Sequence, residues 1–270
     1  MSKGSFAGAS AEGGRIFIVR HAQSAANAGR RTVDPATIPI TEAGTLQAQC
    51  LADLISDRPH LIAVSSYLRT IQTAEPLVRR YPGVLVDEWR VEEFTYLDTT
   101  ACTGTTYVER KALRDVYWTR CDPMWIDGPA CESFADFIAR VRCFERALNA
   151  QNPTQTVVVF THGLVMRTML WLQRHTAGQV FGADLADFDR YRRRISVPNC
   201  AVLRASPNGS GRLLLSTTVW MPRSCSARTR TTGTKPTPTR ISGMPRLTLR
   251  ARRSPRRRRT CSCSGRRWRM

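Results

Sequence analysis

Two short apolar runs, each followed closely by a histidine, constrain the fold of this chain most strongly. Residues 15–19 (RIFIV) lead into Arg20 and His21, and residues 156–160 (TVVVF) are followed by a threonine and His162. Short runs without polar alternation, rich in β-branched residues, are typical of strands that are buried on both faces. Each run therefore predicts an inner strand of a covered sheet, with a histidine just beyond its carboxyl end.

Helical patterns separate the predicted strands. Thr41 is a good N-cap for a helix that begins at Glu42, where an acidic side chain is favourable in the first turn. Strands are expected at 15–19, 61–65, 84–87 and 156–160, with late strands at 201–204 and 213–217. Further helices are expected at 67–80, 106–120, 133–150 and 164–173. Alternating strands and helices predict an α/β fold, with a mostly parallel sheet sandwiched between helices.

The charge of the chain is concentrated at one end. The whole sequence has 41 Lys and Arg against 21 Asp and Glu, a net charge of +20. Residues 221–270 contain sixteen of the basic residues and no acidic one. This stretch has almost no apolar periodicity, so it cannot offset the entropy cost of ordering. We expect a flexible N-terminus at 1–14, one domain at 15–220, and a disordered Arg-rich tail at 221–270.

Three interpretations of this basic tail are open. Its positive charges could bind nucleic acid or an anionic membrane through the release of counterions. It could be an inert disordered extension, or an out-of-frame translation of GC-rich DNA. The last two interpretations are favoured, so we expect neither nucleic acid nor membrane among the partners.

The cysteines and the N-terminus predict a cytoplasmic protein. The nine cysteines include no CxxC pair, which argues against a zinc site. An odd number of cysteines, without an apolar signal segment at the N-terminus, favours reduced thiols. The apolar runs are also far shorter than a membrane-spanning helix requires.

Four side chains near predicted strand ends are candidates for an active site. His21 and His162 each lie just beyond a strand, Arg20 precedes the first histidine, and Arg69 follows the strand at 61–65. Ligands of parallel sheets bind outside the carboxyl ends of the strands. Guanidinium groups match phosphate oxygens through paired hydrogen bonds. The four groups predict a phosphate-binding pocket.

Four segments of the chain resemble the motifs of one family, and they occur in that family's order. Residues 18–27 (IVRHAQSAAN) resemble the RHG motif of the histidine phosphatase superfamily, whose fold is phosphoglycerate-mutase-like, with Ala22 where glycine is usual. Residues 38–44 (IPITEAG), 65–74 (SSYLRTIQTA) and 161–163 (THG) resemble three further elements of that family. The resemblance identifies 15–220 as a histidine phosphatase domain and does not extend to the tail.

The resemblance implies a mechanism that needs no metal or cofactor. His21 would attack phosphorus and form a phosphohistidine, which divides one difficult displacement into two easier steps. Its imidazole must be neutral, so its other nitrogen should donate to a backbone carbonyl. Arg20, Arg69 and His162 would bind the phosphoryl oxygens and stabilise the charge during transfer. Asn27 matches a family position that contacts the phosphoryl group; a turn-forming asparagine is the alternative.

The proton donor for the leaving group is expected in the string Val91-Glu92-Glu93-Phe94. If this stretch is extended, the two carboxylates point to opposite faces, so only one can reach the pocket. The family pattern assigns the acid to Glu93, although Glu92 stands where arginine is usual. A pair of solvated surface carboxylates remains an alternative.

The sequence favours a phosphatase over a mutase. The mutase branch usually has a tryptophan where Ala26 stands, and an RHYG-like string where residues 94–97 (FTYL) follow the acid. The expected activity is hydrolysis of a phosphomonoester, with phosphoglycerate-mutase-type transfer as the first alternative and a nucleic-acid-binding protein as the second. The expected partner is a phosphorylated small molecule, with a phosphoprotein as the other substrate class.

Overall fold

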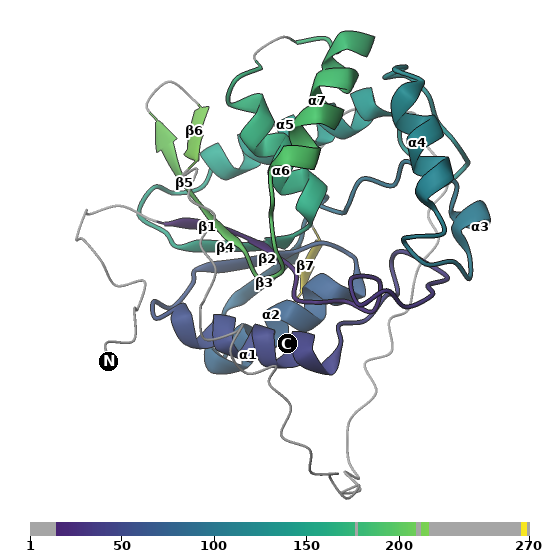
Figure 1. Cartoon of the computed structure of the whole chain (residues 1–270). Helices are drawn as coiled ribbons and strands as arrows, with labels where there is room; N and C mark the ends of the chain where they lie inside the picture. Colours follow the sequence, from purple (N-terminus) through teal and green to yellow (C-terminus); the bar gives the residue numbers. More distant parts are fainter. Residues whose placement is uncertain (1–14, 176–177, 209–211, 216–265, 269–270) are drawn as a thin grey trace, which may run out of the picture.

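A seven-stranded sheet lies at the centre of the computed structural model, which describes residues 15–175, 178–208, 212–215 and 266–268 (Figure 1). The strand order is β6-β5-β1-β4-β2-β3-β7. The inner strands β1, β4, β2 and β3 are parallel, and β5, β6 and β7 are antiparallel to their neighbours. The strands are β1 (Ile16–Arg20), β2 (Leu61–Val64), β3 (Leu85–Glu88), β4 (Val157–Thr161), β5 (Val202–Asn208), β6 (Arg212–Leu215) and β7 (Arg266–Trp268).

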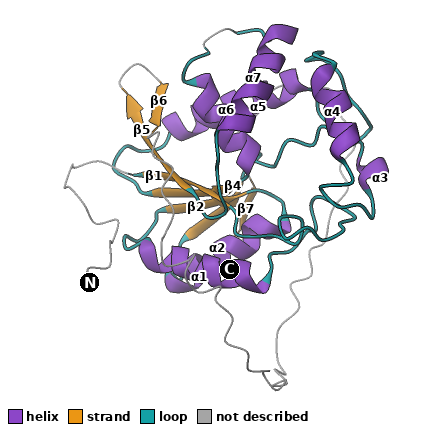
Figure 2. Ribbon diagram, viewed as in Figure 1, coloured by secondary structure: helices purple, strands orange, loops and turns teal. Residues whose placement is uncertain are grey.

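Helices cover both faces of the sheet. Helices α1 and α2 lie on one face, and α5, α6 and α7 lie on the other, with α3 and α4 beside them (Figure 2). The fold is therefore the α/β sandwich with a mostly parallel sheet that the sequence predicts. The helices are α1 (Glu42–Leu54), α2 (Leu68–Arg80), α3 (Thr99–Cys102), α4 (Lys111–Thr119), α5 (Phe134–Asn149), α6 (Gly163–Leu172) and α7 (Gly182–Arg194).

Successive residues of the inner strands belong to two separate cores. Ile16 and Ile18 pack with α5, α6 and α7, whereas Phe17 and Val19 pack with α1 and α2. Side chains alternate between the faces of a strand, so a strand between two layers must be apolar at every position. This requirement explains the continuous apolar runs in the sequence, and it fixes the point at which each strand can end in a polar residue.

Three helices differ from the sequence-based expectation, and one of them is the short helix α3, which was not expected. The helix expected at 106–120 spans only Lys111–Thr119; before it, residues 107–110 form a turn, in which the Glu109 side chain accepts from the Thr106 amide and Thr106 Oγ1 accepts from the Glu109 amide. Helix α7 was not expected at all. Its sequence is highly polar, and only Leu185 and Phe188 are buried, so it lacks the apolar stripe that indicates a helix.

The two ends of the chain fall mostly outside the described residues. This holds for the N-terminus expected to be flexible, 1–14, and for the expected disordered tail apart from Arg266–Trp268. Those three residues form β7, which pairs antiparallel with β3. An edge strand presents unpaired backbone groups that a short extended segment can meet. No helix in the described part of the chain is long and apolar enough to span a membrane.

Candidate active site

The register of the sheet brings the two histidines together. Arg20, the last residue of β1, lies opposite Thr161, the last residue of β4. His21 and His162 follow these residues, and their ring centroids are 5.2 Å apart. Both imidazoles are buried. The strand ends therefore place the two histidines side by side at the carboxyl edge of the sheet, as expected.

Backbone contacts fix the protonation of His21. Nδ1 lies 2.7 Å from the carbonyl oxygen of Ala22, which can only accept a hydrogen bond. The proton of the neutral ring therefore resides on Nδ1, and Nε2 carries a lone pair. The loop itself is held by the Ala22 amide, which donates to Thr73 Oγ1 (3.0 Å), and by Asn199 Nδ2, which donates to the His21 carbonyl (3.0 Å).

Arg69 lies in the first turn of α2, with its guanidinium against His21. Arg69 Nε donates to His21 Nε2 at 3.2 Å, and its Nη1 donates to the carbonyl of Pro35 at 2.6 Å. The guanidinium also packs against the ring of Tyr67, 4.7 Å from its centroid. The predicted arginine is therefore buried in the pocket rather than solvated on the helix surface.

Arg20 and His162 each have one buried nitrogen that forms no hydrogen bond with a described residue. Arg20 Nη1 donates to the carbonyl of Val197 at 2.6 Å, but the buried Nε has no hydrogen-bond partner in the described part of the chain. His162 Nε2 lies 2.8 Å from Ser65 Oγ, and its buried Nδ1 is likewise without a described partner. Buried polar groups are normally hydrogen-bonded, so these two atoms, near the adjacent ends of β1 and β4, are available for hydrogen bonds to a ligand.

Burial and positive charge shift the pKa values of this pocket in one direction. Burial lowers the pKa of His21 well below its ordinary value, and the charges of Arg69 and Arg20 lower it further. Burial, followed by Arg69, does the same to the pKa of His162. Burial also lowers the pKa of Arg20, and that of Arg69 to about 10. Two neutral imidazoles beside two desolvated guanidinium groups form a site that an anion stabilises.

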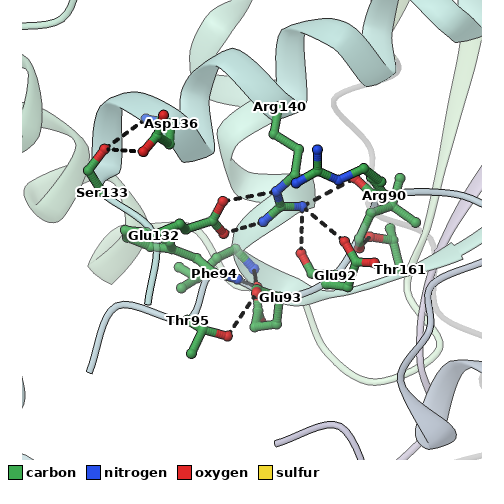
Figure 3. A network of polar contacts seen from close by, with 12 residues as sticks. Arg90, Glu92, Glu93, Phe94, Thr95, Glu132, Ser133, Asp136, Arg140 and Thr161 are labelled. Atoms are coloured by element: carbon green, nitrogen blue, oxygen red, sulfur yellow. Dashed lines mark hydrogen bonds and ion pairs between the residues drawn. The ribbon is translucent and has the colours of Figure 1, made fainter. Parts of the chain in front are cut away.

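Glu93 and Glu92 point to different surroundings. Glu93 reaches the N-terminus of α6, where its Oε1 and Oε2 accept from the Leu164 amide at 3.0 and 3.3 Å. Its charge also raises the pKa values of Arg20 and Arg69 against the effect of burial. Glu92 instead accepts from Ser66 Oγ at 3.1 Å and pairs with Arg140 (Figure 3). Of the two candidate acids, the structure brings Glu93 to the pocket.

Asn27 lies at the end of the loop that follows β1 (residues 21–27). Its Oδ1 accepts from Ser24 Oγ at 3.1 Å and from Asn199 Nδ2 at 3.0 Å. Through these contacts of Oδ1 the side chain helps to shape the loop, as a turn-forming asparagine does.

Sequence reasoning missed three side chains that the structure brings to the site. Asn199, far along the chain, contacts the loop at 21–27, and Ser65 contacts His162. Arg167, one turn into α6, donates from Nε to the carbonyl of Ile195 and lies across Gly163 from Arg20. Ser65 stood within a recognised motif, whereas an asparagine in a loop and a helical arginine gave no signal.

Outside this site, the described part of the molecule contains a cavity but no cluster of metal-binding side chains. In the described ranges, no group of three or more His, Cys, Asp and Glu side chains is arranged to hold a metal ion. A cavity of about 520 Å³ lies between α5 and residues 178–182, and its lining contains no histidine or carboxylate.

Comparison with solved structures finds the same architecture. A mycobacterial glucosyl-3-phosphoglycerate phosphatase in complex with VO3 is 26% identical, with a TM-score of 0.57, over 76% of this chain and 98% of that one. Bacillus stearothermophilus YhfR is 20% identical, with a TM-score of 0.59, over 75% and 95% of the two chains. A phosphoserine phosphatase from Entamoeba histolytica is 17% identical, with a TM-score of 0.57, over 77% and 97%.

A family model accounts for the whole domain. No curated protein matches the chain. The model of the histidine phosphatase superfamily (branch 1) matches residues 16–218, from the first strand to just beyond the last strand of the domain. The matched range contains both histidines, the two arginines and Glu93. The chain therefore belongs to the histidine phosphatase superfamily.

Proposed function

We propose that this protein hydrolyses phosphomonoesters through a covalent phosphohistidine on His21. The observation that supports this most directly is the state of the His21 ring. Its Nδ1 proton is committed to the Ala22 carbonyl, so the lone pair of Nε2 faces the guanidinium of Arg69. A neutral imidazole beside bound positive charge is the arrangement that nucleophilic attack on a phosphoryl group requires.

In the first step, His21 Nε2 attacks phosphorus and the bond to the ester oxygen breaks. Arg69 then donates to the phosphoryl oxygens instead of to the ring. Arg20, whose buried Nε has no described partner, supplies a second guanidinium. Glu93 gives its proton to the departing alkoxide, and Asn27 contacts the phosphoryl group at the edge of the loop. Stabilisation of this charge by fixed donors is a large part of the catalysis.

His162 is proposed as a further donor to the phosphoryl group. If Ser65 donates to Nε2, the neutral ring carries its proton on Nδ1, the atom that no described residue satisfies. In this tautomer Nδ1 is a hydrogen-bond donor, which can donate to a phosphoryl oxygen. This tautomer also explains why a buried histidine next to two arginines can aid phosphate binding while it remains uncharged.

In the second step, water attacks the phosphohistidine and the bond between phosphorus and Nε2 breaks. Glu93, now ionised, accepts the proton of the attacking water and returns to its acid form. His21 is restored with its proton still on Nδ1. The products are an alcohol and inorganic phosphate, so the cycle needs no further reactant.

The comparisons and the cysteines support the wider assignment. Two of the similar structures are phosphatases by name. The proposed substrate is a phosphorylated small molecule, with a phosphoprotein as the other class, and a panel of both would decide between them.

The proposed location is the cytoplasm, because all six described cysteines are free thiols, which fits a reducing compartment.

A trapping experiment tests the covalent step. The full chain is mixed briefly with a phosphomonoester labelled in its phosphoryl group and then denatured. Label should be found on His21, in a bond that is labile to acid and stable to alkali. His21→Ala should carry none. Label that persists in that variant, or turnover that EDTA abolishes, would contradict the proposal.

A further inference from the structure

The segment that leads to Glu93 is held by side chains from distant elements. Beyond β3, the carbonyl oxygens of Arg90 and Glu92 accept from Arg140 Nη1 at 3.2 and 3.0 Å. The carbonyl between them, of Val91, accepts from Thr161 Oγ1 at 2.7 Å. Three successive carbonyls are thus bonded to two side chains, immediately before the residue that reaches the pocket (Figure 3).

Arg140 is itself fixed from a second side. Its Nε donates to Glu132 Oε2 at 3.0 Å and its Nη2 donates to Glu132 Oε1, so the two side chains form a bidentate pair. Glu92 Oε2 lies 3.7 Å from Arg140 Nη1. Burial alone would lower the pKa of Arg140, but the hydrogen bonds and charge of Glu132, together with the charge of Glu92, raise it above its ordinary value. The guanidinium is therefore permanently charged.

The geometry of this contact depends on arginine. Only a planar group with several donors can bind a carboxylate on one edge and two carbonyls on another. The helix that carries it is anchored by Phe137, Ile138 and Val141, which are all buried. Through Arg140, helix α5 therefore fixes the backbone of the segment at 89–93, which is not paired in the sheet.

We propose that Arg140 is a positioning residue that holds Glu93 where it can protonate the leaving group. This inference rests on the proposed function, in which Glu93 is that proton donor. The competing role is purely structural, namely an ion pair that attaches α5 to the segment at 89–93. The two roles differ in one measurable respect. Loss of a positioning residue lowers kcat/KM mainly for a substrate whose leaving group needs a proton, whereas lost stability lowers kcat/KM for all substrates alike.

The primary test compares Arg140→Lys with the unaltered full chain on two substrates. Lysine keeps the charge but cannot make the forked contact. The value of kcat/KM, which covers only the steps up to phosphohistidine formation, should fall by about 10–100-fold for an alkyl phosphate, because small displacements of a catalytic group have effects of this size. With p-nitrophenyl phosphate, whose leaving group scarcely needs a proton, kcat/KM should fall by less than about threefold. Arg142→Lys, on the same helix, is the matched control and should change neither value.

A double variant shows whether Arg140 acts through Glu93. If it does, adding Arg140→Lys to Glu93→Gln should cause almost no further loss on the alkyl phosphate. Multiplied losses would overturn the proposal. So would equal losses on the two substrates with Arg140→Lys, provided that Glu93→Gln alone still distinguishes them. If Glu93→Gln alone treats both substrates equally, the proposed acid is wrong, and the inference fails with it.

A variant on the other side of the segment guards against a failure to fold. Thr161→Val removes the hydrogen bond to the Val91 carbonyl at nearly constant volume, and Thr161→Ser keeps it. Thr161→Val should reproduce the preference for p-nitrophenyl phosphate, and Thr161→Ser should restore the alkyl phosphate activity. Should Arg140→Lys not fold, an unchanged substrate ratio in a folded Thr161→Val would overturn the proposal.

Discussion

The two histidines and the candidate acid reach the pocket from regions that are built differently. His21 and His162 each follow a hydrogen-bonded strand directly, at the level ends of β1 and β4. Glu93 lies five residues beyond the end of β3, in a segment without a ladder. Side chains of Arg140 and Thr161 hold that segment in place.

This difference decides what each region is sensitive to. A ladder consists of backbone bonds that almost any residue can supply, so the histidines stay in place as long as the two cores are packed. The segment at 89–93 depends instead on individual side chains. Substitutions near the acid should therefore act on the proton transfers of the reaction, whereas substitutions beneath the histidines should act on stability and on the reaction with every substrate.

The largest expected effect in this comparison is at the acid. Glu93→Gln should slow hydrolysis of an alkyl phosphate by about 10²–10⁴-fold, the usual contribution of general acid catalysis. Glu92→Gln should cost far less, because Glu92 pairs with Arg140 and Ser66 away from the histidines. The measurement is kcat/KM for both variants with an alkyl phosphate and with p-nitrophenyl phosphate, because this ratio covers only the steps up to release of the leaving group.

The leaving group makes this prediction specific. The defect of Glu93→Gln should shrink markedly with p-nitrophenyl phosphate. Equal defects on both substrates would mean that Glu93 positions phosphate instead of donating a proton. A larger defect in Glu92→Gln would show that the family pattern was aligned one residue out.

A smaller loss of activity is expected from a substitution beneath the loop at 21–27, at Gly44 in the first turn of α1. A Cβ atom at this position would lie 2.3 Å from the carbonyl oxygen of Gln23, which accepts from the Thr41 amide. Gly44→Ala must therefore displace backbone two residues from His21. We expect a loss of about 2 kcal/mol in the free energy of unfolding, typical of overpacking, together with lower kcat on both substrates.

The exposed neighbour of Gly44 provides the control. Thr45→Ala should change the free energy of unfolding by less than about 0.5 kcal/mol, as surface substitutions usually do. Denaturant unfolding of the two variants measures the difference. If Gly44→Ala discriminated between the two substrates as Glu93→Gln does, the contrast between the two regions would be lost.

The sequence predicts the ladder-built region well, for a physical reason. Strands buried on both faces must be apolar at every position, so the end of the apolar run marks the edge of the sheet. That rule located His21 and His162 from local sequence alone. Arg69 needed the family motif in addition, because a helical arginine is usually solvated.

The side-chain-built region is less predictable because its determinants are remote. Local sequence left Glu92 and Glu93 as alternatives, and only the family pattern favoured Glu93. What separates them in the structure is Arg140, far along the chain on α5, whose guanidinium engages Glu92. Helix α7 was missed for a related reason, since its position depends on two buried side chains rather than on a pattern.

Burial of the two histidines predicts a loss of stability in acid. In the unfolded chain the imidazoles bind protons near pH 6.5, whereas burial keeps the pKa values of folded His21 and His162 well below this. Between these limits the unfolded state binds more protons. The free energy of unfolding should therefore fall as the pH drops below about 6.5, by up to about 1.4 kcal/mol per pH unit for each histidine.

A variant at one of the buried histidines separates this effect from general acid unfolding. His162→Gln should reduce the slope of stability against pH between pH 6.5 and 5, since one of the two buried sites no longer titrates. Chemical denaturation of this variant and of the unaltered full chain at several pH values measures the two slopes. An unchanged slope in His162→Gln would contradict the assignment to the buried pocket.

The smallest expected effect concerns the edge of the sheet that leads to the acid. Truncation after Trp220 removes β7 from β3, the strand that precedes the segment at 89–93. That segment keeps its other attachments: β3 pairs with β2, the Trp89 amide donates to the Val64 carbonyl at 2.8 Å, and Arg140 binds the carbonyls beyond. Turnover of a small phosphomonoester should therefore stay within about threefold of the full chain, since an edge strand can lose its outer neighbour without losing its inner one. Steady-state kinetics of the two forms measure this, and a gel-shift assay on both shows separately whether the basic tail binds nucleic acid. A loss of a hundredfold or more would mean that the position of Glu93 depends on the strand from the tail, and that the acid is held from three sides rather than two.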